Sequence, residues 1–398
     1  MSEWKEYRFS DFVLMNPTVK LPANEQVSFV EMKDLENGKR YCYPSSTRLN
    51  SSGAKFENRD TLFARITPCL ENGKICQAKG LKNGVGLGST EFLVFRGKPN
   101  VSDTDFVFYL SRWDEVRSHA EINLDGTSGR QRVPKECFNE LLLNLPKSLT
   151  EQKSIASILS SLDDKIDLLH RQNATLEKMA ETLFRQWFVE EAKEDWEDTT
   201  LDEHTEAFRG LSYKGSGLAE NGIGLPMHNL NSVCEGGGYK YEGIKYYTGE
   251  YKDRHLIQPG NIIVTNTEQG HDFRLIGFPA IVPETFGQKG LFSQHIYKLV
   301  PLNKSYLSNE FIYYLLMMPA VREQIIAATN GSTVNMLAID GLQRPQFKLP
   351  PKELVDDFTL VVSNYWKKKT KNQTQIRTLT ALRDTLLPKL MSGEVKVL

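Results

Sequence analysis

The sequence lacks the features that mark several common protein classes. Its five cysteines are odd in number, scattered over 398 residues, and include no C-x-x-C spacing. This pattern excludes a disulfide framework, gives no sign of a zinc site and fits reduced thiols. No apolar run approaches the roughly 20 residues that cross a bilayer, and the first residues, MSEWKEYRFSDF, lack the apolar core of a signal peptide. We therefore expect a soluble, cytoplasmic protein with no membrane partner.

The sequence also lacks an excess of positive or negative charge. The formal net charge is −1 and the sequence pI is about 6.7. A polycation that binds nucleic acid through bulk charge is therefore excluded. Local basic patches stay possible, because binding depends on where the charges lie.

Motifs that carry catalysis are absent as well. The sequence contains no G-x-x-x-x-G-K-[ST], G-x-S-x-G or H-E-x-x-H motif, and no N-P-P-Y or D-P-P-Y segment of an amino-methyltransferase. We interpret Asp163, Asp164 and Asp167 as solvated charges on a helix rather than as metal ligands. The sequence therefore predicts no catalytic site and no metal site in this chain.

The most informative feature that is present is an internal repeat. Segments of the first half recur in the same order roughly 200 residues later. The matched pairs are Trp4 with Trp196, 60–67 with 260–267, Phe106–Leu110 with Phe311–Leu315, Val116–Arg117 with Val321–Arg322, Gly126 with Gly331, Leu145–Pro146 with Leu349–Pro350, and Thr182–Phe184 with Thr385–Leu387. The ordered series indicates a duplication, although no single match would.

Each repeat has two parts. The first part contains short β-branched and aromatic runs, such as 90–95 and 261–265, and one helical stretch, at 105–119 or 309–327. We interpret it as a compact α+β domain, and a long helix follows it. The predicted boundaries are 1–147 for the first domain, 148–192 for the central helix, 193–350 for the second domain and 351–398 for the C-terminal helix.

The first long helix carries a heptad seam. Ser148 and Glu151 form an S-x-x-E capping box at its start, and seam residues then recur at 4-3 spacing. The seam consists of Ile155, Leu159, Leu162, Ile166, Leu169, Asn173, Leu176, Ala180, Leu183 and Trp187. Asn173 is its one polar member. It is either a tolerated surface residue on a curving helix or a buried residue that fixes the register of a coiled coil.

The second long helix continues this pattern after Pro350–Pro351, and we expect Pro388 to end or kink it. Its seam residues are Val362, Tyr365, Lys369, Asn372, Ile376, Leu379, Leu386 and Leu390, and polar Lys369, Asn372 and Arg383 weaken it. Because neither helix is expected to be stable alone, we predict that the two pair with each other.

Topology makes that pairing antiparallel, because the first helix leads to the second domain and the second helix leads back. The predicted fold class is therefore α+β. Two repeated globular domains are separated by a coiled-coil spacer, pseudo-twofold and circularly organised. A helix of about 40 residues at about 1.5 Å per residue makes the spacer about 60 Å long.

The helical segments resemble a known family. The segment from Leu145–Pro146 through Glu151–Gln152 to IASILSSLDDKIDLLHRQNATLEKMAETLFRQWF resembles the central conserved region of DNA specificity subunits of type I restriction-modification systems. The run LRDTLLPKLMSGEVKV resembles their distal conserved region. The W-x-x-x-x-[FL] segments at Trp4 and Trp196 resemble the starts of their target-recognition domains. The resemblance covers essentially the whole chain.

This resemblance implies a function and partners. Each domain would be a target-recognition domain that reads one half of a bipartite site in double-stranded DNA. The coiled coil would set the gap and dock two modification subunits, which carry S-adenosylmethionine and methylate adenine N6. Restriction subunits with ATP-driven translocase and nuclease activity would join the complex. The chain itself would be a non-catalytic specificity subunit without a bound cofactor, since S-adenosylmethionine, ATP and Mg belong to the partner subunits.

The resemblance does not carry over DNA-contacting residues, so we choose candidates by their chemistry. Polar and basic side chains on loops suit base edges and phosphates, and loops at matching places in both repeats are favoured. The candidates in the first domain are Lys39, Arg40, Arg65, Thr67, Thr127, Ser128, Arg130, Gln131 and Arg132. Those in the second domain are Thr265, Asn266, Thr267, Gln269, His271, Arg274, Ser332, Thr333 and Asn335. The alternative for each is an exposed loop residue that contacts no DNA.

Two further alternatives stay open. The basic run Lys367–Lys369 with Lys371 is a solvated helix face, a set of phosphate contacts along spacer DNA, or a docking site for a partner subunit. The whole chain could also be a coiled-coil protein-interaction scaffold or decoy without direct DNA binding, which the near-neutral charge favours.

Overall fold

The computed structural model describes residues 3–127, 129–270, 272–303, 305–331 and 334–397. The chain forms two compact units. Unit 1 comprises Met1–Arg171 and Gln373–Leu398, and unit 2 comprises Gln172–Asn372. Unit 1 thus combines the first part of the chain with its last helical turns, which is the connectivity that a circular organisation requires.

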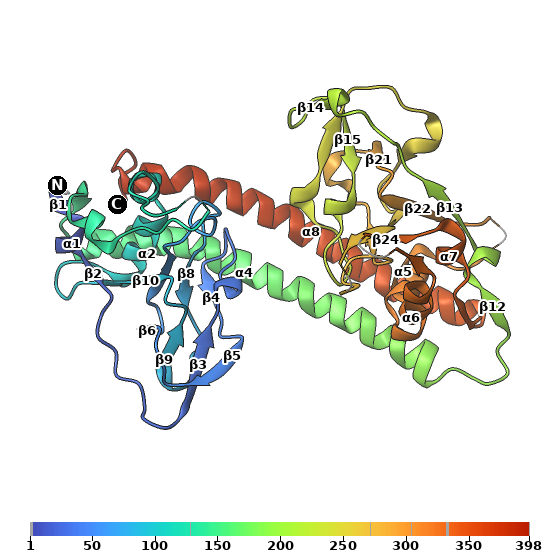
Figure 1. Ribbon diagram of the computed structural model, residues 1–398, viewed down its shortest axis with the longest axis horizontal. Helices are drawn as coiled ribbons and strands as arrows, with labels where there is room; N and C mark the ends of the chain where they lie inside the picture. The colour runs from blue at the N-terminus through green and yellow to red at the C-terminus, as the bar shows by residue number, and fades with distance from the viewer. Residues whose placement is uncertain (1–2, 128, 271, 304, 332–333, 398) are drawn as a thin grey trace. The chain divides into compact units, whose positions relative to one another are not determined.

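Unit 1 is built on two main sheets (Figure 1). One has the strand order β2-β10-β7-β8-β4, the other has the order β5-β3-β9-β6, and β1 pairs with β11. The strands are β1 (Trp4–Arg8), β2 (Val13–Met15), β3 (Gln26–Val30), β4 (Tyr41–Cys42), β5 (Ser46–Leu49), β6 (Ala54–Glu57), β7 (Thr61–Ala64), β8 (Ile75–Ala78), β9 (Val85–Gly88), β10 (Phe92–Gly97) and β11 (Leu142–Pro146). The short helices are α1 (Phe9–Phe12), α2 (Thr104–Arg112) and α3 (Asp114–Ile122).

Unit 2 has the sheets β13-β22-β18-β20, β14-β16-β15-β21-β17 and β19-β24-β23, and β12 pairs with β25. Its strands are β12 (Asp198–Thr200), β13 (Thr205–Arg209), β14 (Leu218–Ala219), β15 (Leu225–His228), β16 (Lys245–Tyr247), β17 (Leu256–Ile257), β18 (Ile262–Thr265), β19 (Thr267–Gln269), β20 (Pro279–Ile281), β21 (Gly290–Phe292), β22 (Ile296–Pro301), β23 (Thr329–Asn330), β24 (Val334–Leu337) and β25 (Gln346–Lys348). Its short helices are α5 (Asn309–Met317), α6 (Pro319–Ala327) and α7 (Ile339–Gln343).

The two units repeat one topology. The order β2-β10-β7-β8 corresponds to β13-β22-β18-β20, and β5-β3-β9-β6 corresponds to β16-β15-β21-β17. Within the second pair of sheets, β3 runs parallel to β9 as β15 runs parallel to β21. The helix pair α2–α3 corresponds to α5–α6 in the order of elements. The duplication predicted from the sequence is confirmed at the level of strand order and direction.

Each unit has its own apolar core, in which fully buried strands contact a short amphipathic helix. In unit 1 every side chain of β7 is buried, and the aromatic rings of Phe9, Phe95 and Phe138 pack together. The Asp103 side chain caps α2 by accepting from two backbone N–H groups, and Ser308 caps α5. The caps fix where each helix begins and so position its apolar face on the sheet.

Two long helices, α4 (Leu149–Arg185) and α8 (Lys352–Met391), each contribute to both units. The side-chain oxygen of Ser148 accepts a hydrogen bond from the Glu151 N–H at 3.4 Å, as the capping box predicts. Pro388 does not end α8, since the helix continues to Met391, and the alternative that it kinks the helix stays a prediction. Pro388 lies in the last turn, where its ring removes one N–H donor to the Asp384 carbonyl, and Met391 is buried in the core of unit 1.

Candidate nucleic-acid interface

Unit 1 brings its two best candidate loops together. The loop after β7 forms a bridge from Ile66 to Arg132. The Thr67 N–H donates to the Gln131 carbonyl at 3.0 Å, and the Gln131 N–H donates to the Thr67 hydroxyl at 3.1 Å. The sequence favoured both segments because they lie at matching places in the two repeats, and the structure shows them hydrogen-bonded side by side.

The side chains of these loops differ in how available they are. Thr127 and Arg130 are exposed, and Thr67 is buried. Arg132 is exposed but binds the Glu91 carboxylate at 2.8 Å, so it can reach a base only by leaving that partner. Ser128 lies outside the described residues.

Arg65 and Lys39 are in intermediate positions. Arg65 is half-buried, and no acceptor in the described part of the chain satisfies its buried Nε. Lys39 pairs with Glu36 at 2.6 Å and is partly exposed. Both cations are therefore only partly exposed, and their contact with DNA stays a prediction.

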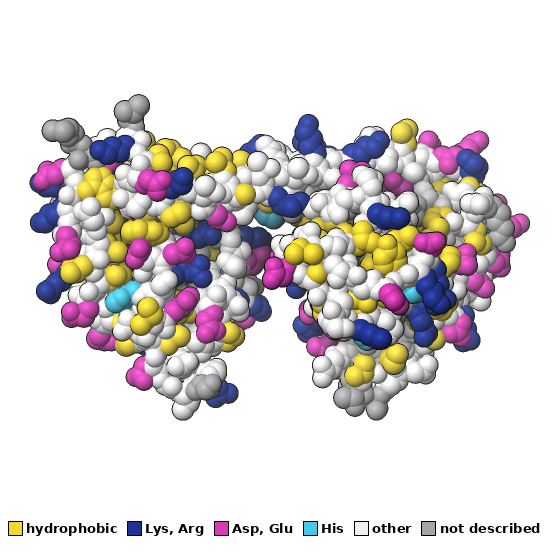
Figure 2. Space-filling model, turned by 90° about the horizontal axis from the view of Figure 1, so that it is seen from above, with side chains coloured by type: hydrophobic (Ala, Val, Ile, Leu, Met, Phe, Trp, Pro, Cys, Tyr) yellow, Lys and Arg dark blue, Asp and Glu magenta, His cyan; other side chains and the backbone are white. Residues whose placement is uncertain are grey.

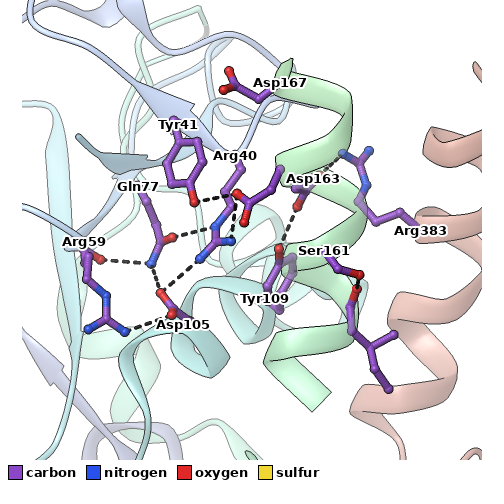
Figure 3. A network of polar contacts seen from close by, with 12 residues as sticks. Arg40, Tyr41, Arg59, Gln77, Asp105, Tyr109, Ser161, Asp163, Asp167 and Arg383 are labelled. Carbon is purple, nitrogen blue, oxygen red and sulfur yellow. Dashed lines mark hydrogen bonds and ion pairs between the residues drawn. The ribbon is translucent and has the colours of Figure 1, made fainter. Parts of the chain in front are cut away.

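Arg40 does not fit its predicted role. It is buried, with its Nε donating to Gln77 Oε1 at 2.9 Å and its Nη2 3.1 Å from an Asp105 oxygen (Figure 3). Its Nη1 lies 3.5 Å from Asp164, and the guanidinium is 4.8 Å from the centre of the Tyr41 ring. We therefore correct the expectation that Arg40 contacts DNA: its donors are used to tie the sheet to α2 and α4.

Unit 2 has the equivalent pair of loops. Strand β19, which follows β18, pairs with β24 so that Thr267 faces Met336 and Gln269 faces Val334. The pairing of Asn330 with Met336 in the β23–β24 hairpin corresponds to the bridge between Asp125 and Arg132 in unit 1. The same loops therefore adjoin in both repeats.

Several of the predicted DNA-contacting residues in unit 2 are buried and stabilise loops instead. Thr265, Asn266 and Asn335 are buried. The Thr265 hydroxyl donates to the Leu275 carbonyl, the Asn266 amide donates to the Gln294 carbonyl at 3.0 Å, and the Asn335 amide donates to the Gly270 carbonyl. These side chains hold the loops in shape, and we correct the expectation that they contact bases.

The candidates of unit 2 that reach solvent are fewer. Gln269 and Arg274 are exposed, and Thr267 is partly exposed with its hydroxyl donating to Asn266 at 2.8 Å. Arg274 lies 3.5 Å from Asp272 and 4.0 Å from Glu235. His271, Ser332 and Thr333 lie outside the described residues.

One positioning residue escaped the sequence argument. The buried carboxylate of Glu268 accepts the backbone N–H groups of Arg274, Leu275 and Ile276 at 2.8–3.0 Å. It holds the loop that carries Arg274 against β19. In the sequence Glu268 is one more polar loop residue, and its role is seen only once the fold of the loop between Glu268 and Ile276 is known.

The seam between α4 and α8 contains a buried ion pair in unit 1. Asp163 and Arg383 are joined at 2.7 Å, and their side chains are 1% and 2% exposed. Tyr109 donates to the other Asp163 oxygen at 2.8 Å (Figure 3). Arg383 also donates to the Gly38 carbonyl at 2.7 Å. The interpretation of Asp163 as a solvated charge was therefore wrong, because its partner lies 220 residues away.

Polar seam residues are also paired in unit 2. The Asn372 amide donates to Asn173 Oδ1 at 2.9 Å, and Lys369 pairs with Glu177, which also accepts from the Tyr314 hydroxyl at 2.9 Å. The residues that appeared to weaken the seam therefore meet polar partners. The paired state of Asn173 agrees with the register-fixing alternative.

Apolar seam residues behave as predicted within each unit. In unit 1, Leu159 is buried in the main core, and Ile166, Leu169, Ile376 and Leu379 form a small cluster between the helices, with Leu162 half-buried and Leu386 packed on the core. In unit 2, Val362 is buried, Leu183 and Tyr365 pack on the core, and Leu176 is half-buried. The residues that meet show that α4 and α8 are antiparallel, because early α4 residues meet late α8 residues.

No large basic patch marks the face shown in Figure 2, where cationic and anionic side chains are interspersed. In the basic run of α8, Lys367, Lys368 and Lys371 are exposed. Across the described residues no cluster of three or more His, Cys, Asp or Glu side chains could hold a metal ion. None of the described helices is both long and apolar enough to span a membrane.

Comparison with known proteins settles the family. A model described as the type I restriction modification DNA specificity domain matches residues 1–178 and 193–359. The chain belongs to this family. It is 25% identical to the Type I restriction enzyme HindI specificity subunit of Haemophilus influenzae, over 99% of this chain and 100% of that protein. It is 29% identical to the EcoEI specificity subunit of Escherichia coli over 48% of this chain and 34% of that protein.

One solved structure of a specificity subunit has the same fold as this chain. The type I restriction-modification S subunit from M. genitalium is 15% identical and superposes with a TM-score of 0.59, over 98% of this chain and 96% of that one. The predicted fold class of two repeated α+β domains with two long helices is confirmed.

Proposed function

We propose that this chain is the DNA-reading specificity subunit of a type I restriction-modification complex, in which each unit reads one half of a bipartite target. The observation that carries the proposal is the duplication within one chain. The family model matches twice, and each unit presents the same pair of hydrogen-bonded loops. Two equivalent reading surfaces in one chain suit a target with two separate halves better than they suit a scaffold without DNA.

In this proposal the exposed loop residues make the DNA contacts. Arg130 and Thr127 serve unit 1, and Gln269, Thr267 and Arg274 serve unit 2. Arginine suits the two acceptors of guanine, and glutamine suits the acceptor–donor pair of adenine. Positive φ angles at Gly126 and Gly129 shape the turn that presents Arg130.

The long helices serve as spacer and as docking surface. Two modification subunits would bind there and supply methyl transfer from S-adenosylmethionine, and restriction subunits would supply ATP-driven translocation and cleavage in the cytoplasm. The chain would contribute no catalytic group. Support comes from Met179 and Leu382, which occupy equivalent positions of α4 and α8 and are 46% and 45% exposed. Two matching apolar side chains away from the seam are what two copies of one partner would require.

The test is separable reading by the reconstituted complex. Methylation is measured on a duplex library in which each half-site is randomised in turn. We expect Arg130→Ala to relax one half-site by about 5- to 150-fold, since a bidentate base contact is worth about 1–3 kcal/mol, and Gln269→Ala to relax the other. Arg377→Ala, which removes an exposed arginine from α8, is the control for lost charge. Equal relaxation of both halves by each loop variant would refute the two-reader proposal.

A further inference from the structure

Unit 1 contains a partly open cavity that its proposed reading role does not use. Its volume is about 400 Å³, and it lies where the end of α2, the start of α3 and the last part of α8 meet two glycine-containing loops. Three arginines line it: Arg112, Arg117 and Arg383. We call this cavity the arginine pocket.

Two of these guanidinium groups have unused donors. Within the described chain, neither Arg112 Nη1 nor Arg117 Nε has a hydrogen-bond partner, although both atoms are buried. Arg383 differs, because it donates to Asp163, Asp384 and the Gly38 carbonyl. A buried donor without an acceptor costs about 1–3 kcal/mol, and more when it is charged. A ligand that brings acceptors to these donors would therefore be stabilised in the pocket.

The carboxylates that line the pocket do not accept hydrogen bonds from these two donor atoms. Asp384 is bound to Arg383 at 2.7 Å and its side chain is 55% exposed, and Asp114 is exposed in the first turn of α3. Arg117 lies 3.9 Å from Glu121 through Nη2, not through the unsatisfied Nε. Burial, followed by the charge of Arg383, lowers the pKa of Arg112, and the negative charge of Asp163 offsets this only in part.

The start of α3 borders the pocket and brings backbone N–H groups near it, together with the acidic side chains of Asp114 and Glu115. This nine-residue helix begins after Trp113, and no side chain caps its N-terminus. Trp113 and Asp114 both line the pocket. Backbone N–H groups at a helix N-terminus favour anions, and the two first-turn carboxylates oppose this. The preference of the pocket for an anion therefore rests chiefly on the two unsatisfied arginines.

The internal repeat shows that the fold does not need these groups. The match of Phe106–Leu110 with Phe311–Leu315 makes Met317 the counterpart of Arg112, and Met317 packs on the apolar core of unit 2. Arg322, the counterpart of Arg117, donates to the Ile276 and Phe273 carbonyls at 2.7 and 3.1 Å. Unit 2 therefore builds the same topology with an apolar residue and a satisfied arginine, and the unmatched donors are particular to unit 1.

We propose that the arginine pocket binds an oxyanion of phosphate size, held by Arg112, Arg117 and the N-terminus of α3. The ligand is either a free phosphate group or a phosphodiester of bound DNA, since both offer the same oxygens. The proposal does not rest on the role of the two reading loops. Arg383, already held by carboxylates, forms the wall of the site.

The test compares full-length wild type with Arg112→Met, which imports the residue of unit 2 and so suits this fold. Thermal unfolding is followed with inorganic phosphate and with chloride at equal ionic strength. We expect the wild-type Tm to rise with phosphate relative to chloride, and isothermal titration calorimetry to detect one site. Arg112→Met should have a higher Tm than wild type without phosphate and should lose the phosphate-dependent rise. Arg377→Met, which removes an exposed arginine of the same unit, should keep it.

A second arm distinguishes the source of the ligand. If a DNA phosphodiester occupies the pocket, Arg112→Met weakens binding to all duplex sequences alike and makes the slope of log affinity against log salt shallower by about 0.9. If a free phosphate occupies it, DNA binding is unchanged while the response to phosphate is lost. An Arg112→Met variant that folds, keeps the phosphate response and binds DNA as wild type does would overturn the proposal.

Discussion

The buried ion pair between Asp163 and Arg383 gives a sharp test of how the helix seam works. Changing Arg383 to Met leaves the Asp163 carboxylate, 1% exposed, with the Tyr109 hydroxyl but without its ion-pair partner. Removing one partner of a buried pair costs about 3–5 kcal/mol, because the other charge stays buried and uncompensated. Unit 1 has roughly 200 residues, a size at which 1 kcal/mol shifts Tm by about 2–4 °C, so Tm should fall by about 6–20 °C.

The double variant separates charge pairing from mere packing. Asp163→Leu with Arg383→Met removes both charges and keeps apolar side chains of similar length. Such replacements are often neutral or stabilising. The Tyr109 hydroxyl then loses its acceptor, which costs about 1–3 kcal/mol. We therefore expect the double variant to recover most of the stability that Arg383→Met loses.

The assay is calorimetric unfolding of the full-length chain, with hydrogen exchange in α2 and in 155–169 as the local reading for unit 1. Asp384→Ala is the control, since it removes the exposed partner of Arg383 and should cost no more than about 1 kcal/mol. A single Arg383→Met variant as stable as wild type, or a double variant no better than the single one, would refute the reasoning.

Three further predictions concern the seam, the spacer and pH. Burial lowers the pKa of His228 to about 4; because the unfolded imidazole, with a pKa near 6.5, takes up a proton first, unit 2 should lose stability as pH falls from about 7 towards 4, by about 2 kcal/mol at pH 5. His228→Gln should flatten this dependence in urea titrations, and an unchanged slope would contradict it. Asn173→Ile with Asn372→Leu introduces the apolar residues that unit 1 has at the equivalent positions, Ile376 and Leu169, and should raise the free energy of unfolding by about 1 kcal/mol. A loss of stability in chemical denaturation would contradict the equivalence of the two positions. Deleting one heptad from each helix, 166–172 together with 373–379, keeps the polar seam pairs and should shorten the preferred DNA gap by about three base pairs, from about 10 Å of helix at about 3.4 Å per base pair. A folded, assembled variant with an unchanged preferred gap on a variable-gap library would show that the helices do not measure the gap.

The architecture could be predicted because the sequence contains periodic and repeated patterns that indicate it. The 4-3 spacing of Leu159, Ile166 and Leu169 needs no knowledge of the rest of the chain to indicate a helix with one apolar stripe. The duplication predicted that the two units share one topology, but the strand order itself was not predicted. Local signals such as Ser148 with Glu151 marked where a helix begins.

The site was only partly predictable, because polarity does not reveal exposure. Arg40 and Arg130 look equally suited to DNA in the sequence. Arg40 is buried because Asp105 and Asp164, far along the chain, supply its counter-charges, whereas Arg130 has an exposed turn around it. Asp163 was misjudged for the same reason. Whether a polar side chain is structural depends on a partner that only the fold brings near.

The most direct test of the central claim is the methylome of cells that express this chain with its partner subunits, compared with cells that lack only this chain. Two readers in one chain predict one added motif, with two specified halves separated by a fixed, unspecified gap and with N6-methyladenine in both halves. The Arg130→Ala strain should change only one half of that motif. Identical methylomes with and without the chain, or a single continuous motif, would contradict the account.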